Sequence, residues 1–463
     1  MAQLLRRRWF VVVVAIAAVL VFASCGGGKG DGTKTETPGS GGGQTKITIW
    51  HSILSPVDGY LKRIIDDFNK SQSKYHVEMV YQGSYTQSLN KLISSIGSKD
   101  TPTLIQLDDV ATQIMIDSGE ITPVQNFIDK EHYDLSAFEP KAIAYYSQNG
   151  TLYSMPFNLS APILFYDKQA FIDAGLDPNK PPQTLDEARA DAERLVKKDA
   201  SGNVTRYGMA LQVSPWFFEN MLAKQGTLLV NNDNGRTARA TEAIFASPEG
   251  NAILTWYRDM IKDKIAYYAQ DDTDALLSVA QQRTSMAIGS TAVVGAALAL
   301  VSVAGQDPQR VGTAQIPAPL PPAGQQGGAV LGGASMWILK RKSQQEQQGA
   351  WEFLKFASTP EQQGRWYAST GYFPTRVSSY DLPEVKQRQE QFPQYGTAAD
   401  QVRNSPNTPA TEGALVGRFN QLRDSVTRAF EQVLGGGSDP ATELKAAADA
   451  STKDMQDYNR TVK

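Results

Sequence analysis

The sequence predicts an α/β fold with a largely parallel sheet, and three observations support this. Segments with strand-like alternation and segments with helical spacing follow one another along the chain. The 463 residues are too many for one ordinary hydrophobic core and enough for two or so. The composition, 41% hydrophobic and 20% charged, is that of a globular protein rather than a disordered one.

The N-terminus has the pattern of an export signal. Three arginines at positions 6–8 precede an apolar run over 9–22, and small residues lead from there to Cys25, the only cysteine. The run is too short and too early for a comfortable stop-transfer helix, although an uncleaved anchor is the alternative interpretation. We therefore expect residues 1–24 to be a signal peptide.

The segment before Cys25 resembles a bacterial lipobox, with Phe22 where the usual pattern has Leu. This resemblance implies that Cys25 becomes the lipid-bearing first residue of the mature protein, anchored at the extracytoplasmic face of the cell membrane. We expect residues 25–45 to form a flexible tether. They are rich in Gly, Ser and Thr and have too little apolar surface to offset the conformational entropy that would be lost on ordering. Loss of the signal removes three arginines and no acid, so the formal charge changes from −3 to −6.

Strand and helix signals alternate from residue 46 onward. The strand-like segments are 46–50, 75–81 and 103–107. The segments with helical spacing of apolar residues are 57–69, 84–96 and 110–118. Because strand and helix alternate in this way, we expect a sheet whose strands are largely parallel.

The second half of the chain has clear helix start signals. Ser247-Pro248-Glu249 and Thr359-Pro360-Glu361 each place a capping residue before a proline at the first helical position. The run 291–303 is small and apolar, and 317–328 is a Pro/Gly-rich connection. The sequence has no fixed-period repeat, which disfavours a solenoid.

Composition and motifs exclude several classes of function. A formal net charge of −3 disfavours a nucleic-acid partner. One cysteine and three scattered histidines provide no disulfide framework and no multi-Cys metal site, so we expect neither a metal nor another cofactor. The adjacent acids at 66–67, 108–109 and 271–272 lack the separation of a glycosidase pair, and the sequence has no nucleophile-elbow, phosphate-loop or zinc-protease motif. We therefore expect no enzymatic activity.

Six short motifs, spread from Lys46 to the end of the chain, resemble those of the extracellular solute-binding proteins of ABC importers. They are Ile49-Trp50-His51-Ser52, Tyr81-Gln82-Gly83-Ser84-Tyr85, Ile105-Gln106-Leu107-Asp108-Asp109-Val110, Pro156-Phe157-Asn158-Leu159-Ser160-Ala161-Pro162, Gly332-Gly333-Ala334-Ser335-Met336-Trp337 and Thr370-Gly371-Tyr372-Phe373-Pro374. The similarity is to the carbohydrate group that includes maltose-binding protein. Within this group, the sn-glycerol-3-phosphate-binding proteins have the most similar pattern.

The resemblance implies a two-lobed periplasmic-binding-protein fold, type II-like, with a ligand cleft between the lobes and three crossover segments. The expected N-terminal lobe comprises 46–157 and 290–331, and the expected C-terminal lobe comprises 158–289 and 332–463. The crossings are expected near Asn158, Ser290 and Gly333. Open α/β sheets bind ligands at the carboxyl ends of their strands, where several of the motifs lie.

Residue by residue, the resemblance places the ligand site on eight positions. They are Tyr85, Asp109, Ser160, Trp216, Ser290, Gly333, Tyr372 and Arg423. Arg423 suits a phosphate because its guanidinium is a planar fork of donors, and Asp109 can accept from glycerol hydroxyls. Gly333 lets a ligand approach the backbone. Since an anionic ligand must approach an acidic protein, we expect Arg423 to make the cleft locally positive.

Structural roles for the same residues remain open. Arg423 lies in a helix expected over 412–434, where an arginine usually faces solvent, and Trp216 beside two phenylalanines is compatible with a core position. Two positions depart from the glycerol-phosphate pattern, which has Glu at Asp109 and Arg at Leu415. The shorter acid leaves more room and the missing arginine removes a cation, so a glycerophosphodiester or an uncharged sugar also fits.

We therefore expect a lipid-anchored, monomeric binding protein that captures glycerol 3-phosphate or a related glycerophosphodiester by cleft closure. It would deliver this small molecule to the permease subunits of an ABC importer. A binding protein for an oligosaccharide such as maltose or trehalose is the alternative, followed by an exported carbohydrate-active enzyme. A structural or adhesive protein would show repeats and many short strands, which the sequence does not have.

Overall fold

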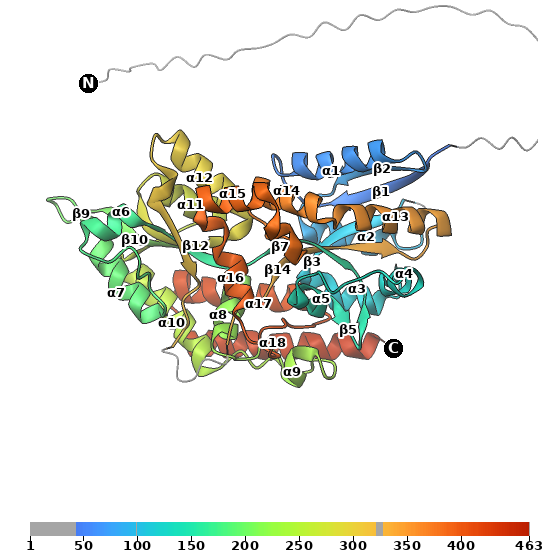
Figure 1. Ribbon diagram of the computed structural model, residues 1–463. Helices are drawn as coiled ribbons and strands as arrows, with labels where there is room; N and C mark the ends of the chain where they lie inside the picture. The colour runs from blue at the N-terminus through green and yellow to red at the C-terminus, as the bar shows by residue number, and fades with distance from the viewer. Residues whose placement is uncertain (1–42, 99, 321–326, 463) are drawn as a thin grey trace, which may run out of the picture. The chain divides into compact units, whose positions relative to one another are not determined.

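The computed structural model describes residues 43–98, 100–320 and 327–462 (Figure 1). The expected signal peptide, Cys25 and nearly all of the expected tether lie outside these residues. The chain from Gln44 onward forms one compact unit. Among the described residues, no helix is both long enough and apolar enough to span a membrane.

Six strands form the first sheet, in the order β2-β1-β3-β14-β4, with β7 also paired to β14. The strands are β1 (Thr45–His51), β2 (Tyr75–Tyr81), β3 (Leu104–Asp108), β4 (Ile121–Thr122), β7 (Met155–Ser160) and β14 (Gly332–Leu339). β1 is parallel to β2 and β3, as the strand and helix pattern predicts. β14 comes from a distant part of the chain and is antiparallel to all three of its neighbours.

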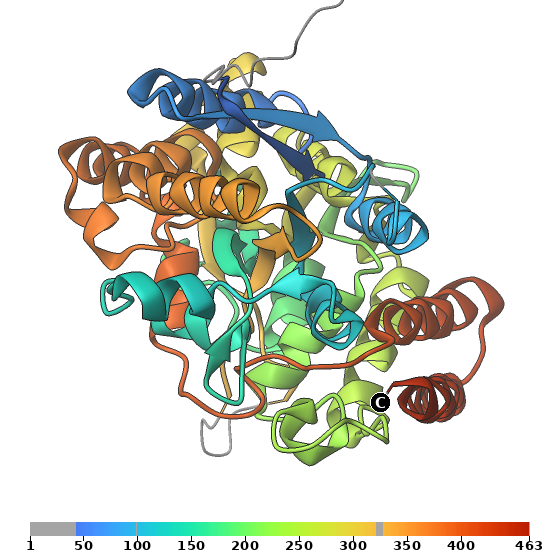
Figure 2. The same ribbon diagram turned by 90° about the vertical axis from the view of Figure 1, so that its right-hand side faces the viewer.

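Helices from both ends of the chain surround the first sheet. They are α1 (Asp58–Ser71), α2 (Tyr85–Ser95), α3 (Thr112–Ser118), α4 (Gln125–Glu131), α5 (Pro140–Tyr145), α13 (Gln344–Ala357), α14 (Pro360–Thr370) and α15 (Pro383–Gln391). The next helix, α16 (Thr397–Arg403), packs instead against two strands of the second sheet. α13 and α14 pack against α1 although they are far away in sequence (Figure 2). A short hairpin of β5 (Ser147–Gln148) and β6 (Thr151–Leu152) leads into β7.

The second sheet has the order β11-β10-β12-β8-β13, with β9 paired to β10. Its strands are β8 (Pro162–Asp167), β9 (Lys197–Lys198), β10 (Val204–Leu211), β11 (Ala266–Tyr268), β12 (Thr284–Ser290) and β13 (Val311–Gln315). The helices near it are α6 (Lys168–Asp173), α7 (Leu185–Leu195), α8 (Pro215–Lys224), α9 (Asn231–Gly235), α10 (Pro248–Lys262), α11 (Asp272–Ala280), α12 (Val294–Val303), α17 (Phe419–Gly436) and α18 (Pro440–Thr461). β10 is parallel to β11 and β12, and β8 is antiparallel to β12 and β13.

The two sheets divide the chain differently from the expected lobe boundaries. β13 lies in the second sheet, and β14 lies in the first, so each of these two strands is in the opposite lobe from the one expected. Near Asn158 the chain passes from the first sheet to the second, because β7 and β8 lie in different sheets, and before Gly333 it passes back. After Ser290, however, the next strand belongs to the same sheet as β12. The helix directly after Ser290, α12, packs in the first apolar core beside α14.

Two of the helix start signals are confirmed, and one helix boundary is wrong. Ser247 and Thr359 accept hydrogen bonds from backbone N–H groups of the first turns of α10 and α14. The helix that carries Arg423 begins at Phe419 rather than at residue 412. The preceding segment has Gly413 at a φ of 78°, and its carbonyl groups accept from the Arg236 side chain instead of closing helical turns.

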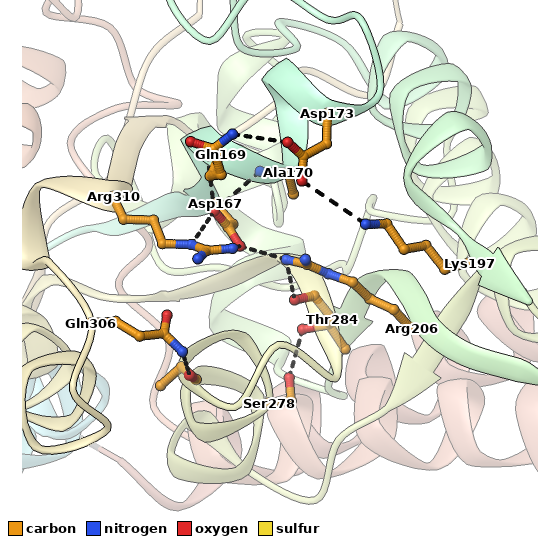
Figure 3. A network of polar contacts seen from close by, with 11 residues as sticks. Asp167, Gln169, Ala170, Asp173, Lys197, Arg206, Ser278, Thr284, Gln306 and Arg310 are labelled. Atoms are coloured by element: carbon orange, nitrogen blue, oxygen red, sulfur yellow. Dashed lines mark hydrogen bonds and ion pairs between the residues drawn. The ribbon is translucent and has the colours of Figure 1, made fainter.

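A buried ion cluster fastens the second sheet (Figure 3). The Asp167 side chain, 2% exposed at the end of β8, accepts from Arg206 Nη2 on β10 and from Arg310 Nε and Nη2, each at 2.6 Å. Backbone N–H groups at the start of α6 also donate to this carboxylate. Because both carboxylate oxygens are satisfied within the sheet, we assign this cluster a structural role.

Candidate functional site

The eight predicted site residues lie where strands end and helices of the other sheet approach. Tyr85 begins α2, Asp109 follows β3, Ser160 ends β7, Ser290 ends β12, Gly333 is the second residue of β14, Trp216 and Arg423 lie on α8 and α17, and Tyr372 follows α14. Arg423 binds Asp109 directly, and Tyr85 and Gly333 both lie against Asn158. Whether they hold a ligand remains a proposal, but the structure brings them into one region.

The Arg423 guanidinium is held between two carboxylates from different parts of the chain. Its Nε and Nη2 donate to the two carboxylate oxygens of Glu219 on α8, each at 2.7 Å. Its Nη2 also donates to Asp109 Oδ2 at 3.1 Å, and the Tyr145 hydroxyl donates to the same oxygen at 3.3 Å. Only 17% of the Arg423 side chain is exposed. Because Asp109 follows the first sheet and Arg423 packs with the second core, this cluster joins the two halves of the unit.

The cluster contains more carboxyl groups than cations, and their burial affects their protonation. Burial raises the pKa of Asp108 to about 7, the neighbouring Asp109 adds to the rise, and Arg423 opposes it. Burial also raises the pKa of Glu219, again opposed by Arg423. Two carboxyl groups thus bind one guanidinium, and a third, that of Asp108, interacts with it electrostatically. The expectation that Arg423 makes this region locally positive is therefore wrong, because its charge is already matched by the carboxylates that it binds.

The raised pKa of Asp108 predicts a pH dependence of stability. The ordinary value is 3.8, so between about pH 4 and pH 7 the folded state binds more protons than the unfolded state. Stability of the empty protein therefore falls as the pH rises through this window. We expect Asp108→Asn to raise the melting temperature by about 2–4 °C at pH 8 and to change it little at pH 4.

Thermal unfolding at both pH values checks this prediction. Asp66→Asn, which changes an exposed carboxylate on α1, is the matched control and should leave the difference between pH 4 and pH 8 unchanged. An Asp108→Asn variant with the same pH dependence as the wild type would contradict the assignment.

Two consecutive glycines at the start of β14 permit close contacts. A Cβ on Gly332 would lie 2.3 Å from Cζ2 of Trp216, so the indole ring lies directly against this strand. Gly333 has a φ of 106°, and a Cβ there would lie 2.0 Å from the carbonyl oxygen of Asn158. Ser160 is paired with Gly332 in the β7–β14 register. The buried indole Nε1 of Trp216 has no hydrogen-bond partner among the described residues, so it is available as a donor.

The two predicted tyrosines share one buried amide. Asn158, which is fully buried on β7, donates from Nδ2 to the Tyr85 hydroxyl at 3.3 Å. Burial raises the pKa of Tyr372, and a hydrogen bond from the Asn158 side chain opposes the rise. The Tyr372 ring stacks on Trp366, with ring centroids 5.6 Å apart. Burial likewise raises the pKa of Tyr85 well above its ordinary value, so its hydroxyl keeps its proton.

Ser290 lies at the carboxyl end of β12, beside another buried acid. Its hydroxyl accepts from the backbone N–H of Ala292 at 3.2 Å, and its own backbone donates to Asp272. Burial raises the pKa of Asp272 to about 6, and a hydrogen bond from Gln212 opposes the rise. Asp272 also contributes to the raised pKa of Tyr372, which connects this end of the site with the tyrosines.

Several residues that contact or support the predicted site residues were not predicted from the sequence. They are Gln106, Asp108, Tyr145, Tyr146, Asn158, Glu219 and Asp272. Glu219 had a usable signal, because it is an acid within the otherwise apolar start of α8, one turn after Trp216. The tyrosines had none, since their hydroxyls reach the site through tertiary packing alone.

The chemistry of the site is that of hydrogen bonding to a polar solute. Carboxylates supply acceptors, and the guanidinium, tyrosine hydroxyl and indole groups supply donors. In the described ranges, no group of three or more His, Cys, Asp or Glu side chains has the arrangement of a metal site. The second departure from the pattern, Leu415, is 2% exposed, and its backbone donates to Asn234.

Comparison with known families gives a match to the model of the bacterial extracellular solute-binding proteins, over residues 63–394. The sn-glycerol-3-phosphate-binding periplasmic protein UgpB of Yersinia pseudotuberculosis is 32% identical over 416 residues, covering 88% of this chain and 91% of that protein. UgpB of Escherichia coli is 29% identical over 427 residues, covering 90% and 94%.

Solved structures share the fold. UgpB from Mycobacterium tuberculosis in complex with glycerophosphocholine superposes with a TM-score of 0.73 at 20% identity, covering 90% of this chain and all of that one. The GacH receptor of Streptomyces glaucescens, solved unliganded and with acarbose, has a TM-score of 0.73 at 19% identity, covering 89% and 99%. The two-lobed α/β fold expected from the sequence is thereby confirmed.

Proposed function

Because this chain belongs to the bacterial extracellular solute-binding proteins, we propose that it captures a glycerophosphodiester for an ABC importer. Family membership makes it an exported solute-binding protein. The ligand, the lipid anchor at Cys25, the monomeric state and the permease partner are parts of the proposal. In this role no residue of the cleft carries out covalent chemistry.

The observation that carries the choice of ligand is the pairing of Arg423 with Asp109 and Glu219. A phosphate monoester carries up to two charges near neutral pH and would face three carboxyl groups around one guanidinium. A diester carries a single charge and is therefore repelled less. The change from Glu to Asp109 leaves additional room on the same side. The site thus favours a glycerophosphodiester over free glycerol 3-phosphate.

Relatives of known ligand support both the class of protein and the choice of a glycerophosphodiester as its ligand. The name of the Yersinia and Escherichia relatives specifies sn-glycerol-3-phosphate, and the Mycobacterium structure holds glycerophosphocholine. A choline headgroup is cationic and would be attracted by the acidic cluster. The Trp216 indole also offers a π surface, on which a quaternary ammonium group binds well.

Closure of the two lobes supplies the mechanism. Polar groups from both sheets contribute to the site, so a bound solute would bridge the lobes as Arg423 and Asp109 do in the present structure. Expulsion of water on closure strengthens these contacts, because they then act in a lower dielectric. The closed complex would dock on the permease subunits.

A thermal-shift screen tests the proposal. We expect glycerophosphocholine to raise the melting temperature most, glycerol 3-phosphate to raise it less, and glycerol to have no effect at the same concentration. Maltose and trehalose test the alternative that the chain binds an oligosaccharide, as GacH does with acarbose. A shift with either sugar and none with the two glycerol phosphates would refute the proposed ligand.

A further inference from the structure

A chain of buried amides leads from the end of β1 to the Tyr85 hydroxyl. The backbone N–H of Ser52 donates to Gln106 Oε1 at 3.0 Å, and Gln106 Nε2 donates to Asn158 Oδ1 at 2.7 Å. Asn158 Nδ2 then donates to the Tyr85 hydroxyl oxygen at 3.3 Å. Gln106 lies on β3 and Asn158 on β7, the two strands that flank β14 (Figure 1).

The direction of every bond in this chain is fixed at its first member. A backbone N–H can only donate, so it must face the oxygen of the Gln106 amide. The Gln106 NH₂ group therefore points to Asn158, which must offer its own oxygen in return. The Asn158 NH₂ group is left to point at Tyr85. Both amides are 0% exposed, so no water competes with this order.

The direction of these bonds determines the role of the Tyr85 hydroxyl. A phenol oxygen can accept and can donate one hydrogen. Because Asn158 occupies the oxygen as a donor, the Tyr85 hydrogen has to find another acceptor. Within the described residues, no side-chain or backbone oxygen takes it. The hydroxyl hydrogen is thus directed to whatever occupies the site.

We propose that Gln106 and Asn158 are positioning residues that hold the Tyr85 hydroxyl as a hydrogen-bond donor to the ligand. This inference rests on the proposed function, since it takes Tyr85 to contact the ligand. It goes beyond that function by giving two residues without ligand contact a role in selecting ligands with an acceptor oxygen at this point.

Asn158→Asp reverses only the last bond of the chain, the one to Tyr85, with almost no change in side-chain shape. An ionised carboxylate still accepts from Gln106, but it also accepts from Tyr85, so the hydroxyl hydrogen turns away from the ligand. We expect calorimetric titration with glycerophosphocholine to show a loss of affinity of about 10- to 100-fold, the effect of one hydrogen bond to a charged group. Lowering the pH should restore affinity relative to the wild type, because protonation of the introduced carboxyl regenerates a donor.

A double-mutant cycle separates positioning from added charge. Tyr85→Phe removes the hydroxyl, so Asn158→Asp should cost little further affinity in that background. A purely electrostatic or structural effect of the new acid would persist. Gln363→Glu is the matched control, since this buried amide also accepts from a backbone N–H and donates from Nε2, but only to the carbonyl of Ala357. It should leave affinity unchanged.

If Asn158→Asp does not fold, Gln106→Glu makes the same test. An ionised carboxylate there has no N–H for Asn158, so the Asn158 amide must turn and present its oxygen to Tyr85. The inference is overturned if either folded variant binds glycerophosphocholine with wild-type affinity. It is also overturned if Asn158→Asp lowers the affinity as much in the Tyr85→Phe background as in the wild type. Neither result affects the proposed function. Absence of binding by the wild type to both glycerophosphocholine and glycerol 3-phosphate overturns the proposed function, and with it the acceptor on which the inference depends.

Discussion

Arg423→Met is expected to abolish ligand binding and to lower the free energy of unfolding by about 3–5 kcal/mol. The substitution removes the partner of two buried carboxylates, Asp109 and Glu219, which then remain desolvated and unpaired. Thermal unfolding measures the loss of stability, and calorimetry with glycerophosphocholine measures the loss of binding. A variant with wild-type stability would show that the cluster is not held together as described.

The two effects of Arg423 can be separated. Replacing Glu219 by Leu in the same chain removes one of the unpaired carboxylates, so the double variant should recover part of the stability without recovering binding. Arg460→Met is the control for loss of an ion pair. Arg460 Nη1 donates to Asp457 Oδ1 at 2.9 Å, and both side chains are largely exposed, so its loss should cost no more than about 1 kcal/mol.

Gly333→Ala is expected to have a comparable effect by a different route. The φ of 106° is unfavourable for any residue with a Cβ, and the new Cβ would lie 2.0 Å from the carbonyl oxygen of Asn158. Because the new Cβ would collide with a backbone atom, β7 itself would have to move. We expect a loss of about 3–5 kcal/mol in the free energy of unfolding and no detectable binding.

Two other glycines provide the comparisons. Gly332→Ala would meet the Trp216 ring, a side chain, so it should weaken binding more than it weakens the fold. Gly435, inside α17, has nothing within 4 Å of its ideal Cβ, and Gly435→Ala should stabilise the protein by up to about 1 kcal/mol. Equal unfolding temperatures of the Gly333→Ala variant and the wild type would contradict the close approach of β14 and β7.

Local patterns predicted the first part of the fold well. The segment 75–81 was expected as a strand and is β2, and the apolar stripe of α1 is buried where its spacing places it. These elements are determined by periodicity within a few residues, which a single sequence contains. The cap before α10 was visible for the same reason.

Long-range pairing was not visible in the same way. β13 and β14 follow one another along the chain, yet they pair in different sheets. The sheet that a strand joins depends on which distant strand it pairs with, and a local sequence pattern does not contain this information. The start of α17 was misplaced because the carbonyl groups of Glu412 and Gly413 bond to Arg236, a partner far away in sequence.

In the candidate site, too, individual residues were predictable from the sequence, whereas their contacts with one another were not. The resemblance located Asp109 and Arg423 individually, but it did not show that they bind each other. The charge of the region was therefore judged wrongly, because a cation already paired with two carboxylates no longer attracts a phosphate as a free one does. The amide order through Gln106 and Asn158 depends on two strands that meet only in the folded sheet.

Calorimetric titration of the wild-type protein at pH 8 tests the central claim most directly, because Asp108, with its pKa of about 7, is then mostly ionised. We predict that glycerophosphocholine binds at least about 10-fold more tightly than glycerol 3-phosphate, since the diester carries one charge into an acidic cluster. We predict no measurable heat of binding for maltose. Tighter binding of glycerol 3-phosphate than of the diester, or binding of maltose alone, would contradict the account.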